Sequence, residues 1–135
     1  MILLTPELRE RLLANGRDQD ADHVPVVRFF NPVAAGTWLA TELDEDRDTL
    51  FGLADLGFGC PELGRFSLSE LQSARLAFGL GIERDVLFMG EFPISAYAEA
   101  ARAARSIPGG ERVLHAGACR QPRAALRQKT GEEEG

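Results

Sequence analysis

Apolar residues near the start of the chain recur at helical spacing. Leu8 and Leu12 stand four residues apart and form one stripe of a helix. Thr5 can accept hydrogen bonds from the free amides of a helix start, and Pro6 suits the first helical turn. The Asn-Gly pair that follows tolerates the left-handed conformation that ends many helices. We therefore predict a first helix over residues 6–14.

Three segments with strand character follow this helix. They are rich in β-branched and aromatic residues, as strands are, and span residues 24–30, 37–43 and 49–56. The last two flank Asp44-Glu-Asp-Arg-Asp48, a charged connection of hairpin length, so we predict an antiparallel meander. Large apolar residues occupy both faces of these strands. We expect helices against one face and loops or a partner over part of the other.

The second half of the chain alternates short strand and helix patterns. Ser69 is the predicted cap of a short helix, because Gln72 completes a capping-box pattern three residues later. Ser95 opens an alanine-rich stretch with high helix propensity. The predicted elements here are a strand over 62–67, a helix ending at 77–79, a fifth strand within 82–88 and a helix over 95–105.

Together these elements predict an α+β domain with a mainly antiparallel sheet of four to five strands and about three helices. At 135 residues the chain has room for one hydrophobic core. The glycine pair Gly109-Gly110 ends the apolar periodicity, and the sequence beyond it is rich in Gly, Arg and Gln. We therefore predict a single domain over residues 1–107 and a flexible, disordered basic tail over 108–135.

The composition is that of a globular protein, with 44% hydrophobic and 27% charged residues. No stretch approaches the roughly 18 consecutive apolar residues that a membrane span requires. The apolar start of the chain meets Thr5-Pro6 too early for a signal-peptide core. We expect a cytoplasmic protein without a membrane partner. The two cysteines, Cys60 and Cys119, lack CxxC spacing, so no disulfide framework is expected.

Charge is distributed unevenly along the chain. Residues 1–100 hold 8 Arg and no Lys against 17 Asp and Glu, whereas residues 101–130 hold 7 basic residues against one acid. An acidic body repels the phosphate backbone, so direct nucleic-acid binding by the body is disfavoured. The basic tail could contact nucleic acid, but a short Arg-rich tail is more often simply solvated.

The sequence lacks the ligand sets of common metal sites. The spacing of Asp18, Asp20 and Asp22 resembles the first half of a calcium loop, yet His23 and Phe29 occupy the positions that require glycine and glutamate. The histidines, His23 and His115, do not stand at zinc-ligand spacing from either cysteine. We predict no metal and no cofactor.

Phosphate-binding and nucleophile patterns are equally incomplete. Gly57-Phe58-Gly59 is followed by neither GxGxxG nor GK[ST], which favours a turn that needs positive φ. Ser67, Ser69 and Ser95 stand at helix starts, where capping explains them. Cys60 has no histidine beside it and is interpreted as a small buried apolar residue. No catalytic residue is assigned.

One polar group forms a candidate binding site. Symmetric closure of the hairpin pairs Asp44 with Thr49, Glu42 with Phe51 and Trp38 with Asp55, which places two acids and an indole on one face. A register shift of one residue would scatter them, and the simpler alternative is a set of solvent-facing ion pairs. Adding neighbours on adjacent strands, the candidate residues are Arg28, Trp38, Glu42, Asp55, Glu62 and Arg65.

Four strings of the sequence, at residues 23–32, 37–43, 51–64 and 67–71, are distinctive. Together they resemble a bacterial family of unknown function, family 2958. The resemblance extends through residues 82–85 and the helix around Tyr97, covering residues 2–105. It implies a small single-domain product of plasmids and other mobile elements, encoded near genes for DNA processing, and it brings no established activity.

Two classes of function remain open. The first is a non-enzymatic protein-interaction module of a mobile element, which modulates a DNA-processing or defence protein through its acidic surface. The second is a small enzyme that uses Arg28, Glu42, Asp55 and Glu62 for acid-base chemistry on an unknown substrate. We favour the first class and expect a protein partner.

Overall fold

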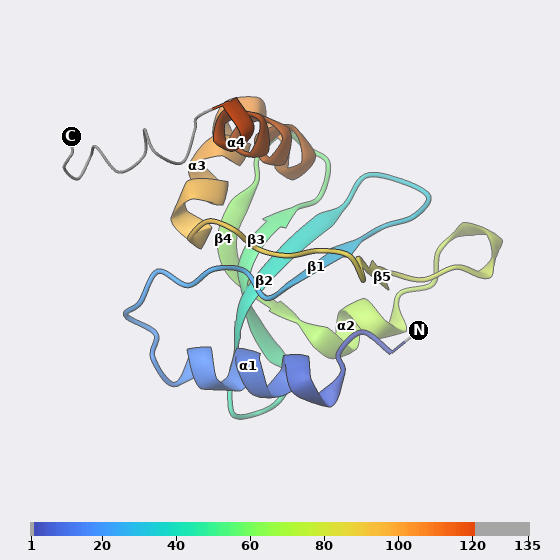
Figure 1. Cartoon of the computed structure of the whole chain (residues 1–135). Coiled ribbons are helices and arrows are strands. Elements are labelled where there is room, and N and C mark those ends of the chain that lie inside the picture. Colours follow the sequence, from blue (N-terminus) through green and yellow to red (C-terminus); the bar gives the residue numbers. More distant parts are fainter. Residues whose placement is uncertain (1, 121–135) are drawn as a thin grey trace.

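A five-stranded antiparallel sheet in the order β4-β3-β2-β1-β5 forms the centre of the molecule (Figure 1). The computed structural model describes residues 2–120 of the chain. The strands are β1 (Val27–Phe30), β2 (Thr37–Leu43), β3 (Thr49–Asp55), β4 (Glu62–Ser67) and β5 (Glu83–Arg84). The helices are α1 (Pro6–Gly16), α2 (Leu68–Ser73), the short 3-10 helix η1 (Ala77–Gly79), α3 (Ile94–Ala104) and α4 (Ile107–Arg120). The predicted α+β fold with a mainly antiparallel sheet is confirmed.

Each face of the sheet packs on its own pair of helices, because side chains alternate along a strand. The α1 face carries Phe29 and Leu50, which are fully buried in a core with residues of α1 and α2. The α3 face carries Leu39 and Leu53, which pack against α3 and against Ile107 at the start of α4. Apolar residues on both faces are therefore covered by helices, whereas the sequence predicted helices on one face only.

A β-bulge interrupts the ladder between β2 and β3. Ala40 pairs with Gly52 and Glu42 pairs with Phe51, so Thr41 is the extra residue. Its hydroxyl donates to the Phe51 carbonyl at 3.2 Å, and its carbonyl accepts from the Asn15 side chain of α1 at 2.9 Å. The β2 residues that precede this bulge therefore pair with β3 residues one position away from those that an unbroken register would give.

Capping explains where the helices start, and it corrects two predicted caps. Thr5 accepts from the Leu8 amide at 3.2 Å, as predicted for the first helix. The cap of α2 is Ser67 instead of Ser69, and this helix ends at Ser73, short of the predicted 77–79. The helix predicted to open at Ser95 begins at Ile94, with Asp22 of a distant loop accepting from the Ser95 amide at 3.1 Å. Local sequence could not show that a remote carboxylate would serve there.

The largest correction concerns the C-terminal region. Residues 108–120, predicted as the start of a flexible tail, are helical in α4, which packs on α3. The glycine pair taken as the end of the domain permits this contact, because a Cβ at Gly110 would lie 2.6 Å from the Ala101 backbone nitrogen. The rest of the predicted tail, residues 121–135, lies outside the described residues. Within residues 2–120, no helix is long and apolar enough to cross a membrane.

Candidate functional site

The strand register divides the six predicted site residues between the two faces of the sheet. Because paired residues share a face, partners of Leu39, Leu53 and Phe51 lie on the α3 face. That face holds Arg28, Glu42, Asp55 and Arg65, whereas the α1 face holds Trp38 and Glu62.

The β-bulge explains why Trp38 does not lie on the predicted face of the sheet. The predicted pairing of Glu42 with Phe51 is confirmed, and the Asp44 amide donates to the Thr49 carbonyl at 2.9 Å. The predicted pairing of Trp38 with Asp55 is wrong, because Trp38 pairs with Ala54 on the other side of the bulge. Trp38 consequently belongs to the apolar core instead of a polar surface. Glu62 is exposed at the start of β4, an outer strand of the sheet.

Arg28 ties the sheet to α4. Its guanidinium makes two parallel hydrogen bonds to Glu111, with Nε at 2.9 Å from Oε2 and Nη2 at 3.0 Å from Oε1. Asp85, which follows β5, lies 3.7 Å from Nη1. Both the Arg28 and Glu111 side chains are largely withdrawn from solvent, so the planar fork holds the helix in one orientation.

Asp55 fixes the start of the same helix. This carboxylate is 5% exposed, and its Oδ2 accepts from the Ile107 amide at 2.9 Å. Its Oδ1 accepts from the Gly57 amide at 2.9 Å, in the turn that leaves β3. The negative charge therefore sits at the amino end of α4, where the helix dipole favours it.

Arg28 and Asp55 both line a cavity of about 450 Å³. It is enclosed by the loop between β1 and β2, the end of β3 and the junction between α3 and α4. The structure thus brings together two of the six predicted residues at one hollow, and Glu42, Trp38, Glu62 and Arg65 do not line it. The other side chains that shape it include Phe30, Asn31, Thr37, Arg105, Ser106 and Pro108.

Glu42 and Arg65 lie at a different position on the α3 face. Glu42 is 6% exposed, and within residues 2–120 its side chain makes no hydrogen bond or ion pair. Burial raises the pKa of this carboxyl, an effect that His23 and Arg65 oppose. Arg65 itself forms an ion pair with Asp44 at 3.3 Å and lies over the Phe51 ring.

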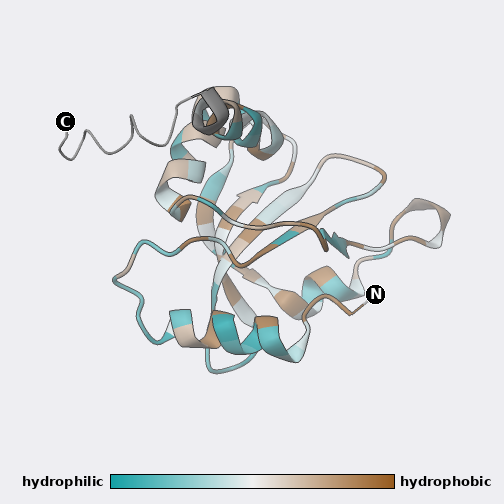
Figure 2. Cartoon of the chain, viewed as in Figure 1, coloured by the Kyte–Doolittle hydropathy of each residue, from teal (hydrophilic) through white to brown (hydrophobic). Residues whose placement is uncertain are grey.

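Two acidic loops meet close to Glu42. Arg17, which follows α1, forms an ion pair with Glu45 of the β2–β3 turn at 2.7 Å and so holds the two loops together. Figure 2 shows both loops as hydrophilic. We call this surface the acidic end, and its acidic residues are Asp18, Asp20, Asp22, Asp44, Glu45, Asp46 and Asp48.

Two carboxylates of the acidic end accept hydrogen bonds within the fold. Asp46 accepts from the Thr49 hydroxyl and from two backbone amides, which lowers the pKa of its carboxyl. Asp48 accepts from the Ser69 amide and the Ser67 hydroxyl, with the same effect on its pKa. Asp18, Asp20 and Glu45 are exposed, and their carboxylates accept no hydrogen bond from a backbone amide among the described residues.

Comparison with known families agrees with the sequence resemblance. Residues 3–108 match the model of the family described as "Protein of unknown function (DUF2958)". The chain belongs to this family. No curated protein and no solved structure matches it. Arg28 and Asp55 lie within the part of the chain that the DUF2958 model covers, whereas Glu111 lies beyond it.

Sequence reasoning missed the residues that α4 contributes to the DUF2958 chain. Glu111 was assigned to the tail, and only the spacing of Ile107 and Leu114 could have indicated a helix there. His115 follows one turn later, 3.5 Å from Glu91 and against the rings of Phe92 and Tyr97. Burial raises the pKa of the Tyr97 hydroxyl.

The described residues add no support for a nucleophilic or metal site. Cys60 is exposed, so its interpretation as a buried apolar residue is wrong. In the part of the chain that the structure describes, no three His, Cys, Asp or Glu side chains could hold a metal ion. The features left to consider are therefore the acidic end and a cavity lined in part by polar side chains.

Proposed function

We propose that this chain is a non-enzymatic protein-interaction module that binds a basic protein through its acidic end. The observation that carries the proposal is the Arg17–Glu45 ion pair, which joins two loops distant in sequence into one surface. The two loops hold seven acids against two arginines, Arg17 and Arg47, and Arg65 of β4 pairs with one of these acids, Asp44. Such a concentration of one sign of charge accelerates encounter with an oppositely charged surface.

The partner fits the chemistry of proteins that handle nucleic acid. A groove that binds the phosphate backbone is lined by Lys and Arg, and an acidic surface can occupy it in place of DNA. We take the partner to be a DNA-processing or defence protein of a bacterial mobile element, in keeping with the setting that the family resemblance implies. The exposed carboxylates of Asp18 and Asp20 are the most available to it, and the exposed Glu45 lies beside them in its ion pair with Arg17.

The test compares capture of partners from host lysate by the full chain and by matched variants. The variant D18N/D20N/E45Q neutralises three exposed acids of the acidic end, and E62Q/E70Q/E99Q neutralises three exposed acids elsewhere. We expect wild type and the second variant to capture a basic protein that duplex DNA displaces, and the first variant to lose it. Capture of nothing at moderate salt, or equal capture by both variants, would sink the proposal.

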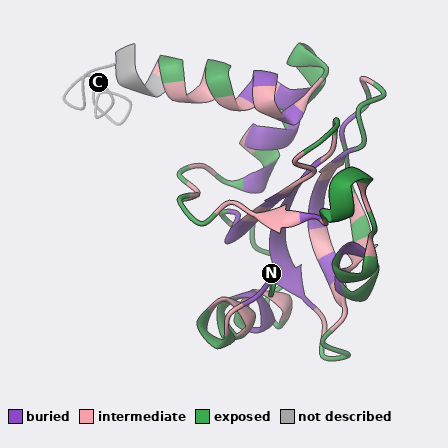
Figure 3. Cartoon of the chain, turned by 90° about the vertical axis from the view of Figure 1, so that its right-hand side faces the viewer, coloured by how far each residue is buried: buried purple, intermediate pink, exposed green. Residues whose placement is uncertain are grey.

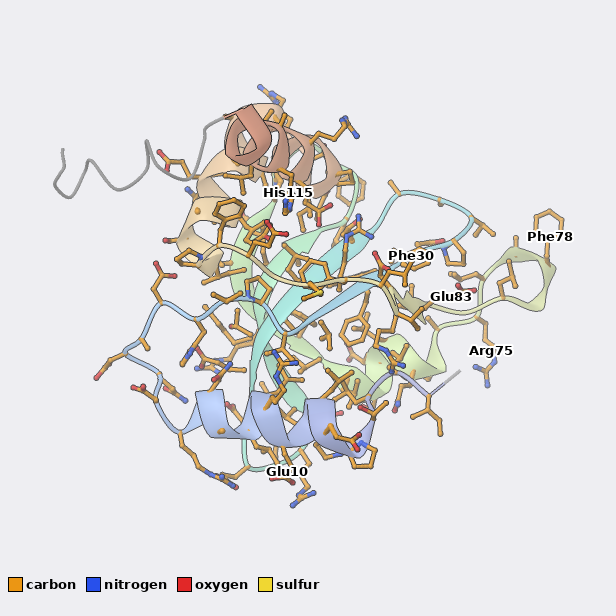
Figure 4. The ribbon with its side chains drawn as sticks, viewed as in Figure 1. Glu10, Phe30, Arg75, Phe78, Glu83 and His115 are labelled. Atoms are coloured by element: carbon orange, nitrogen blue, oxygen red, sulfur yellow. The ribbon has the colours of Figure 1, made fainter. Side chains whose placement is uncertain are left out.

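A third variant separates charge from apolar contact. Phe78 lies at the tip of the exposed loop that carries η1, where it is 91% exposed at a φ of 62° (Figures 3 and 4). Asparagine tolerates this left-handed conformation, so Phe78→Asn removes the ring without disturbing the backbone. We expect unchanged capture. Loss of the partner here, with capture retained by D18N/D20N/E45Q, would assign binding to the apolar loop instead.

The four side chains that the alternative enzyme hypothesis requires do not meet in one site. Arg28 and Asp55 share a cavity, but Glu42 does not line it and Glu62 lies on the opposite face of the sheet. Acid-base chemistry requires its groups within hydrogen-bond reach of one substrate. The geometry therefore favours the interaction module.

A further inference from the structure

The cavity beside Arg28 and Asp55 has the construction of a ligand site. Its volume of about 450 Å³ falls in the range of small-molecule pockets. Thr37 and Asp55, each 5% exposed, form its floor as a cross-strand pair. Exposed Arg105 and the partly buried Phe30 also line it, and exposure places Arg105 at its rim.

The floor holds unused capacity to form hydrogen bonds. Within the described residues the Thr37 hydroxyl makes no hydrogen bond, although buried polar groups in proteins almost always have a partner. Each Asp55 oxygen accepts one backbone amide, whereas an ionised carboxylate has about four acceptor positions. The floor therefore suits a ligand group that donates hydrogen bonds, such as a hydroxyl.

Charge compensation decides which ligand fits. Two backbone amides donate hydrogen bonds to the Asp55 carboxylate, and one of them lies at the start of α4. The Arg28 guanidinium forms an ion pair with Glu111. The Arg105 guanidinium has no ion pair among residues 2–120. Asn31, which also lines the cavity, accepts hydrogen bonds from two backbone amides with its Oδ1, which leaves its Nδ2 as a donor. Among the described residues, Arg105 is thus the charged lining residue whose side chain has neither an ion pair nor a hydrogen bond.

We propose that this cavity binds a sugar phosphate, with its hydroxyls on Thr37 and Asp55 and its phosphate on Arg105 and Asn31. Carboxylates are common acceptors for sugar hydroxyls, and guanidinium groups suit phosphate. A zwitterion such as an amino acid would place an ammonium on a carboxylate whose charge is already met. This site is independent of the acidic end, so its test and that of the interaction proposal fail separately.

Isothermal titration calorimetry on the full chain tests the proposal. The probes are ribose 5-phosphate and adenosine 5′-monophosphate, with ribose, inorganic phosphate and glycine for comparison. We expect the two sugar phosphates to bind at least about tenfold more tightly than the other three. Failure of both to bind at millimolar concentration, or tighter binding of glycine, would overturn the assignment.

Three variants then locate the binding. Thr37→Val removes the unpaired hydroxyl at constant shape, and we expect binding about tenfold weaker with unchanged thermal unfolding. Arg105→Gln should weaken binding by a similar factor or more. Arg102→Gln is the matched control, because Arg102 is an exposed arginine in the last turn of α3, three residues before Arg105, that does not line the cavity. Equal losses for the two arginine variants, or unchanged binding in Thr37→Val, would place the ligand elsewhere.

Discussion

Asp55 and Glu42 are two carboxylates on the same face of the sheet, buried to nearly the same extent at 5% and 6% exposure. Asp55 accepts a backbone amide on each oxygen and anchors the start of α4. Glu42 has no hydrogen-bond partner among residues 2–120. Burial is therefore no guide to what a carboxylate contributes, because the fold gives one of these groups two hydrogen-bond donors and gives the other none among the described residues.

Chain position explains the difference. Asp55 ends a strand, and its short side chain reaches the Gly57 amide of the turn that follows and the free Ile107 amide of α4, which starts far along the chain but packs against this end of the sheet. Glu42 lies in mid-sheet after the bulge, where neighbouring backbone amides are already paired in the ladder. Its charge is opposed first by burial and further by Asp44 and Asp18, which raise the pKa of the Glu42 carboxyl, while His23 and Arg65 act in the opposite direction.

Removing the Asp55 carboxylate should have the largest effect. Asp55→Ala leaves the Ile107 and Gly57 amides without their acceptor, so we expect the free energy of unfolding to fall by about 2–3 kcal/mol. Urea denaturation measures it. Glu62→Ala, at an exposed position, serves as control with an expected change below about 0.5 kcal/mol. A loss equally small in Asp55→Ala would contradict the anchoring role.

The Arg28 contact should rank second. Arg28→Met leaves Glu111 without its bidentate partner, and we expect a loss of about 1–2 kcal/mol in the same measurement. Arg28→Lys keeps the charge but not the fork, so it should recover only part of this loss. Full recovery by lysine would show that charge alone matters.

A double variant sharpens the contrast further. Arg28 and Asp55 both hold α4 on the sheet, so once one anchor is lost the other has less ordered structure to stabilise. The double variant Asp55→Ala/Arg28→Met should therefore lose less free energy of unfolding than the two single variants lose when their losses are added. Strict additivity would mean that the two contacts hold α4 independently.

The sheet was largely predictable because its signals are local. The strands over 37–43 and 62–67 have their predicted bounds, and 49–56 ends one residue early, since β-branched and apolar residues between charged or glycine-rich turns mark them clearly. The segment predicted as 24–30 is paired only from Val27, and that within 82–88 only over two residues. Those bounds depend on what lies beside the strand, which sequence does not show.

The candidate site was predictable only in part, for two physical reasons. A single extra residue at Thr41 shifts the pairing, which removed Trp38 from the predicted face. The partners of Arg28 and Asp55 come from α4, whose glycines resemble a helix end and in fact allow close helix contact. Both errors arise from tertiary contacts that override local signals.

Neutralising Glu42 should have the smallest effect, and of opposite sign. A carboxyl whose pKa is raised by folding binds its proton more tightly in the folded state. Its contribution to stability is thus fully present below the unfolded pKa and is lost as pH rises through the folded pKa. We expect Glu42→Gln to match wild type at the acidic side of this window and to be more stable above it, by less than about 1 kcal/mol because solvent near the acidic end screens the charge.

The pH dependence of the free energy of unfolding, measured from about pH 4 to 7, tests this sign. Glu99→Gln is the matched control, because it makes the same substitution at an exposed glutamate of α3. Lower stability of Glu42→Gln at neutral pH would mean that the Glu42 charge is satisfied in the folded protein. The contrast with Asp55 would then disappear, because both buried carboxylates would stabilise the fold.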